Sequence, residues 1–167
     1  MSDRLSEYAN GSYGSVMTVS FFTLGAGMIV LGLGWARTTK GWPRIVPLAV
    51  IAGGCGMVVS GIFPTDPVGE STSSESVHSL ASGSASMLLI GAAVAFALLS
   101  GARGGRRAIG PLSVLAFTAL VLGAASPLLH ETHWAGLSQR LLWLALMAWL
   151  LLAAWQAGSR DKTLTSR

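Results

Sequence analysis

The stretch Gly61–Ser82, GIFPTDPVGESTSSESVHSLAS, is the longest polar interruption in an otherwise apolar sequence. It holds three acids, two prolines and one of the three histidines of the chain. Apolar runs flank it on both sides. We therefore interpret the rest of the chain as hydrophobic segments that hold this polar loop at one face of a membrane.

The composition excludes an ordinary soluble domain. Of the 167 residues, 51% are hydrophobic and 11% are charged, and the mean hydropathy is +0.60. Soluble domains carry about 25% charged residues, and a chain of this size could not hide so much apolar surface from water. A lipid bilayer is the expected solvent. The lone Cys55 excludes an intramolecular disulfide and is expected to be buried in a helix.

Five apolar runs are long enough to cross a bilayer. A helix needs about 20 apolar residues to cross about 30 Å of hydrocarbon. The predicted fold is all-α, a polytopic transmembrane helical bundle that forms a single membrane domain over residues 1–167. Its spans are expected at about residues 13–35, 45–63, 78–100, 109–129 and 141–157.

The charged residues divide between the two sides of this bundle. Nine of the eleven basic residues fall in the loops after the first and third spans and in the C-terminal tail, whereas six of the seven acids fall on the opposite side. The positive-inside rule then places the N-terminus outside and the C-terminus in the cytoplasm, in a plasma membrane. Basic clusters between spans are typical of membrane loops, so membrane lipids are the expected partners and nucleic acid is not.

Residue size along the spans predicts how they are arranged. The first three are rich in glycine and serine, which let helices approach closely in lipid, so they are expected to form the tight centre. The fifth is rich in leucine and is expected to face lipid over much of its surface. Trp35 is expected in the aromatic belt at a membrane interface.

His78 is the first candidate for a functional residue. On a helix it shares one face with Ser82 and Ser86, at a spacing of four residues. A polar stripe at the head of a span usually faces the bundle interior or a wet cavity, because lipid would penalise it. Two interpretations stay open: hydroxyl groups that join helices, or a functional cavity.

A metal centre is a second hypothesis for the same side. His78, His130, His133 and Glu131 supply the ligand types of a zinc or iron site. The HETH sequence at 130–133 is not HExxH, because its histidines are three residues apart and that motif requires four. Histidines that only hydrogen-bond to a loop are the alternative.

Arg140 breaks the positive-inside pattern, since it stands at the outer end of the fifth span. It can snorkel to the headgroups, bind a phosphate or carboxylate, or form an ion pair with an acid. An ion pair with Asp66 would fasten the polar loop to the last span; Glu7 and Glu131 are the other acids on that side. The candidate polar site at the outer face therefore comprises Glu7, Asp66, His78, Ser82 and Arg140.

Four motifs carry a family resemblance: LSEYANGSYG at 5–14, GIFPTDPVG at 61–69, the Val77-His78 pair and GLSQR at 136–140. Together they resemble, in order and over nearly the whole chain, a prokaryotic integral membrane family catalogued as domain of unknown function 998. That family usually has six spans, the first before the SEY motif, and this chain resembles a version without that span. The resemblance implies no established activity.

The sequence favours a non-enzymatic membrane protein, either a lipid- or partner-binding scaffold or an accessory subunit, because no catalytic motif is recognisable. A second copy of the chain or another membrane subunit is the expected protein partner. The alternative is a metal-dependent enzyme that acts on a lipid or small substrate at the outer interface, because His, Asp, Glu and Arg gather on that side.

Overall fold

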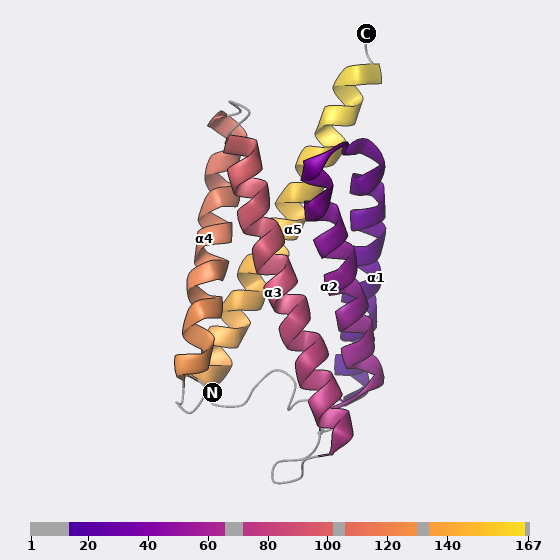
Figure 1. The fold of residues 1–167 in the computed structure, drawn as a ribbon, viewed down its shortest axis with the longest axis vertical. Coiled ribbons are helices and arrows are strands. Elements are labelled where there is room, and N and C mark those ends of the chain that lie inside the picture. Colours follow the sequence, from indigo (N-terminus) through magenta and orange to yellow (C-terminus); the bar gives the residue numbers. More distant parts are fainter. Residues whose placement is uncertain (1–13, 66–71, 102–105, 130–133, 166–167) are drawn as a thin grey trace.

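The computed structural model describes residues 14–65, 72–101, 106–129 and 134–165 (Figure 1). These residues form five α-helices and one short 3-10 turn, and they contain no strand. The elements are α1 (Gly14–Thr38), η2 (Trp42–Arg44), α2 (Ile45–Ile62), α3 (Ser73–Gly101), α4 (Arg106–Leu129) and α5 (Ala135–Thr165).

The predicted all-helical membrane bundle is confirmed. Four helical stretches are long and apolar enough to cross a membrane: Gly14–Thr38, Ile45–Ile62, Ser73–Leu99 and Gly136–Gln156. Within the described residues, α4 contributes a shorter apolar stretch, Gly110–Ala125. The side of the membrane on which each end lies stays a prediction from charge.

The third helix begins earlier than its apolar run, because Thr72 caps it. The Thr72 hydroxyl accepts a hydrogen bond from the Ser74 amide at 3.1 Å, and Glu75 follows Thr72 at the spacing of a capping box. His78 therefore lies in the second turn of α3 and not at its start. This extension places the His78 side chain beside the end of α2.

Helices that follow one another along the chain lie side by side, from α1 through α5. Figure 1 shows α5 running obliquely from the side of α4 toward α1 and α2. The contact between α1 and α2 is so close that it requires glycine. A Cβ atom on Gly25 would lie 2.7 Å from the carbonyl oxygen of Gly54, and one on Gly32 would lie 2.9 Å from that of Pro47. The expected role of small residues is confirmed at this contact.

The fifth span exposes much of its surface, as predicted: Leu144, Leu151 and Trp155 of α5 are largely exposed. Leu146, Trp149 and Ala153 of α5 are fully buried. In their apolar windows, α2 and α5 are each 39% buried, whereas α1 is 17% buried. α5 thus combines an exposed face with a buried one. Cys55, expected inside, is exposed on α2.

Three aromatic rings close one end of the space between α1, α3 and α5. Trp35 of α1 and Phe96 of α3 have ring centroids 5.4 Å apart, and Trp149 of α5 lies 6.3 Å from Trp35 and 6.1 Å from Phe96. We call these residues the aromatic cluster. Trp35, expected in the interfacial belt, thus directs its ring at other helices. In the described part of the chain, Trp149 Nε1 is the buried side-chain polar atom without a hydrogen-bond partner.

Candidate functional site

His78 lies at the opposite end of this space and is only 3% exposed. Its Nδ1 atom is 2.9 Å from the carbonyl oxygen of Ser60 and 2.8 Å from that of Phe63. Carbonyl oxygens only accept hydrogen bonds, so Nδ1 must carry the proton and donate to both. The ring also meets Phe21 of α1 edge-on, with centroids 5.4 Å apart.

The sequence explains why two carbonyl groups at the end of α2 need this donor. In a continuing helix, Ser60 and Phe63 would accept hydrogen bonds from the amides of residues 64 and 67. Both of those residues are prolines, which have no amide hydrogen. In a membrane such carbonyl groups must find a donor within the protein. His78 supplies it, and we call this arrangement the His78 cap.

A further hydrogen bond joins the same two helix ends. The Ser74 hydroxyl near the start of α3 donates to the carbonyl oxygen of Pro64 at 3.1 Å. The FPTDP sequence and the histidine that follows it therefore act together in the connection between α2 and α3. The prolines end α2, and His78 of α3 donates to the two carbonyl groups that the prolines leave without helical donors.

A pocket of about 200 Å³ lies beside the His78 cap. Side chains from α1, α2, α3 and α5 line it. Its polar lining residues are Ser20, His78, Ser82 and Gln139. Its apolar lining residues are Met17, Phe21, Leu24, Met57, Trp143 and Met147.

The polar groups of α1 and α3 in this pocket already use their donors. The Ser20 hydroxyl donates to the Val16 carbonyl at 2.8 Å, and the Ser82 hydroxyl directs its proton to the Ser79 carbonyl at 3.4 Å. Nδ1 of His78 is engaged in the cap, so in the neutral ring Nε2 is an acceptor. Among the described residues, Nε2 has no hydrogen-bond partner. The pocket therefore presents hydrogen-bond acceptors in an apolar enclosure.

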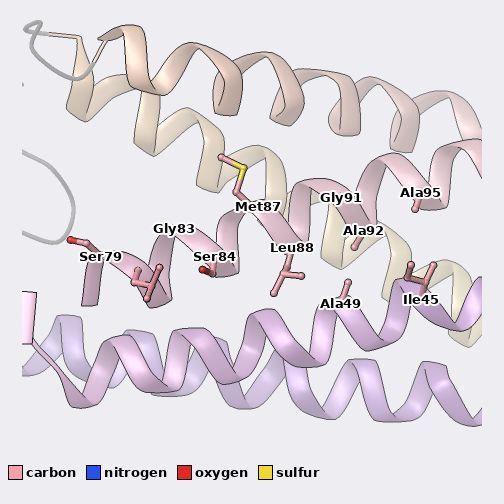
Figure 2. Close-up of a pocket in the computed structure, with 11 residues that line it drawn as sticks. Ile45, Ala49, Ser79, Gly83, Ser84, Met87, Leu88, Gly91, Ala92 and Ala95 are labelled. Carbon is pink, nitrogen blue, oxygen red and sulfur yellow. The ribbon is translucent and has the colours of Figure 1, made fainter. Parts of the chain in front are cut away.

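A larger groove of about 860 Å³ runs along another face of α3, beside α2 (Figure 2). Ser79 and Ser84 lie along it, and Cβ atoms added at Gly83 or Gly91 would meet nothing within 4 Å. Ser84 is exposed there. The two faces of α3 thus differ: one holds His78 and Ser82 among other helices, and the other opens outward.

The structure brings together two of the predicted site residues, His78 and Ser82. Ser86 bonds to the Ser82 carbonyl of its own helix at 2.9 Å. Arg140 is half-buried on α5, next to Gln139, and has an interaction partner. Glu7, Asp66, His130, Glu131 and His133 lie outside the described residues, so the predicted ion pair and metal site stay predictions. Within the described ranges, no three metal-binding side chains gather in one place.

The family model described as "Protein of unknown function (DUF998)" matches residues 1–156. The chain belongs to this family. The resemblance inferred from the four motifs is therefore confirmed, and it agrees with the apolar helices in indicating an integral membrane protein. No curated protein and no solved structure gives a significant match.

Several pocket residues of this DUF998 protein were not anticipated from sequence. The carbonyl groups that His78 binds could have been found, because prolines four residues after Ser60 and Phe63 leave both without helical donors. Ser20 and Met57 could not be predicted as pocket residues, because each lies in an apolar span in which no motif or spacing distinguishes it. Gln139 lies in the GLSQR motif, but the charge pattern singled out its neighbour Arg140.

Proposed function

We propose that this DUF998 protein is a non-enzymatic scaffold of a prokaryotic plasma membrane that binds a lipid-like ligand near its outer face. The pocket beside the His78 cap carries the proposal. Ten residues from four helices line it, and six of them are apolar. Ligand sites are typically concave and mostly apolar, with a few polar groups that orient the ligand.

Two further observations support binding over transport. The aromatic cluster joins α1, α3 and α5 through ring contacts at the end away from His78. The His78 ring, moreover, is held by two backbone carbonyl groups and so contributes to the rigidity of the pocket wall.

The location of the pocket at the outer face rests on charge. Nine of the eleven basic residues fall in the loops after the first and third predicted spans and in the C-terminal tail, and basic residues favour the cytoplasmic side. A second copy of the chain or another membrane subunit stays the proposed protein partner.

Native mass spectrometry of the protein in lipid nanodiscs tests ligand binding. Ser82→Leu adds bulk inside the pocket, whereas Ser84→Leu adds the same bulk on the exposed groove face. We expect the wild type and Ser84→Leu to retain a bound lipid-like molecule that Ser82→Leu loses. The absence of bound ligand from all three proteins, or equal retention in all three, would contradict the proposal.

The second candidate is a metal-dependent enzyme at the outer interface. Histidines that bind metals usually donate their other ring N–H to a carboxylate or backbone carbonyl, and His78 Nδ1 does so. His130, Glu131 and His133 would supply the further ligands. Elemental analysis tests this function: one zinc or iron per chain that is lost in both His78→Asn and His130→Gln would support it. A protein that takes up neither metal after reconstitution would rule it out.

A further inference from the structure

The chemistry of the pocket defines the kind of molecule that it can hold. None of the ten described lining residues is an aspartate, glutamate, lysine or arginine. The polar ones offer acceptor atoms: Nε2 of His78 in its neutral form, the hydroxyl oxygens of Ser20 and Ser82, and the amide oxygen of Gln139, whose side chain also carries N–H donors and already has an interaction partner. An anionic headgroup would find more acceptors here than the donors that it needs. A neutral group with a hydrogen-bond donor fits instead.

The apolar lining favours a flat ring as the body of that molecule. Phe21 and Trp143 contribute aromatic rings, and Met17, Met57 and Met147 contribute thioether sulfurs. Thioethers make favourable contacts with aromatic rings and adapt to their shape. A dry cavity of about 150 Å³ accommodates benzene. The pocket, at about 200 Å³, therefore has room for one substituted six-membered ring.

We propose that the pocket binds a neutral phenolic ring, with the ring hydroxyl donating a hydrogen bond to Nε2 of His78. This proposal rests on the proposed ligand-binding function and names its ligand class. A phenol has a pKa of about 10 and stays neutral and donating at physiological pH. The ring can belong to the head of a membrane lipid, such as a quinol or a phenolic lipid, or to a small free phenol.

His78 has two roles that one substitution can separate. The side-chain nitrogen of asparagine lies near the position of histidine Nδ1, so His78→Asn retains a donor for the carbonyl groups of Ser60 and Phe63. It has no atom at the position of Nε2. His78→Asn therefore keeps the His78 cap and removes the acceptor from the pocket, and an unchanged unfolding temperature verifies that the cap is intact.

Fluorine NMR titration with 4-fluorophenol and 4-fluoroanisole in detergent micelles tests the proposal. The two probes have the same ring, but the anisole lacks the donor. We expect the wild type to bind the phenol about two- to tenfold more tightly than the anisole, as the loss of one hydrogen bond predicts. His78→Asn should abolish this preference, and Ser84→Leu should retain it. If His78→Asn unfolds, Ser82→Ala tests the acceptor instead: it leaves Nε2 of His78 in place and should retain the preference, and a lost preference would overturn the assignment to His78.

The outcomes distinguish this proposal from the function on which it rests. Equal binding of both probes to the wild type, blocked by Ser82→Leu, would overturn the phenolic ligand and leave the ligand-binding pocket standing. Failure of both probes, with no ligand retained in nanodiscs, would overturn both. Mass analysis of the retained ligand separates the sources, because a quinol or phenolic lipid carries a long apolar chain and a free phenol does not.

Discussion

The two ends of the region between α1, α3 and α5 differ: one is packed with aromatic rings and the other is open. At one end, Trp35, Phe96 and Trp149 are in ring contact. At the other, the pocket beside His78 leaves about 200 Å³ open. Both ends contain aromatic rings, so aromatic content does not decide which end closes.

The difference lies in what accompanies the rings. In the pocket, small hydroxyl residues on α1 and α3 face flexible methionines, and the His78 ring is tied to α2 by two hydrogen bonds. A ring held in this way cannot turn into the open space. In the aromatic cluster, Trp149 of α5 reaches both Trp35 and Phe96. Hydrogen bonds therefore fix the His78 wall of the pocket, whereas contacts between large aromatic side chains occupy the other end.

The closed end should respond most strongly to loss of volume. Trp149→Ala is expected to lower the free energy of unfolding by about 3 kcal/mol, near the low end for buried tryptophan, because lipid and not water surrounds the bundle. Trp143→Ala in the pocket should cost about 1 kcal/mol, because Trp143 is half-buried beside existing space. Unfolding by SDS titration in mixed micelles measures both. Equal losses would mean that the two ends do not differ in this way.

Loss of the His78 cap is the next largest effect. His78→Ala leaves the carbonyl groups of Ser60 and Phe63 without the donor that they have in the wild type. We expect a loss of about 2 kcal/mol, the usual cost of an unsatisfied buried polar group. His78→Asn should recover most of it. Thermal unfolding followed by circular dichroism checks this, and a His78→Ala protein as stable as the wild type would refute the cap.

These features differ in how far sequence could predict them. The helices and the importance of His78 were predictable, because spanning a bilayer requires continuous apolar runs and a buried polar residue needs a partner. The hydrogen-bonding alternative for His78 was predicted only in kind: its partners are two backbone carbonyl groups left without helical donors by prolines, and sequence analysis did not name them. Which face of α5 is buried could not be predicted from its leucines, since a helix that is apolar all round suits either lipid or a core.

Restoring the amide that proline removes should partly compensate for loss of the cap. Pro64→Ala provides an amide hydrogen four residues after Ser60, where a continuing helix would use it. In the His78→Ala background we expect this change to recover about 1 kcal/mol, one net hydrogen bond. In the wild type it should be neutral or unfavourable, because Ser60 already has a donor. A double-mutant cycle measures the difference, and strict additivity would show that Pro64 and His78 do not act on the same carbonyl group.

The smallest effect on stability is expected where volume is added to the open end. Ser82→Leu introduces a larger side chain into space that the protein already leaves empty, and the hydroxyl that it removes bonds only within its own helix, at 3.4 Å. The free energy of unfolding should therefore change by no more than about 0.5 kcal/mol, as for a change that strains no neighbour. Ser84→Leu on the exposed face is the matched control, and both are measured by SDS titration. If Ser82→Leu alone lowered the free energy of unfolding by more than about 1 kcal/mol, the added side chain would be clashing with its neighbours. The pocket would then be closed in solution and its shape determined by packing and not by hydrogen bonds. A near-zero change in the free energy of unfolding, together with loss of bound ligand, would instead establish that the open end is a ligand-binding pocket whose empty volume contributes little to the stability of the fold.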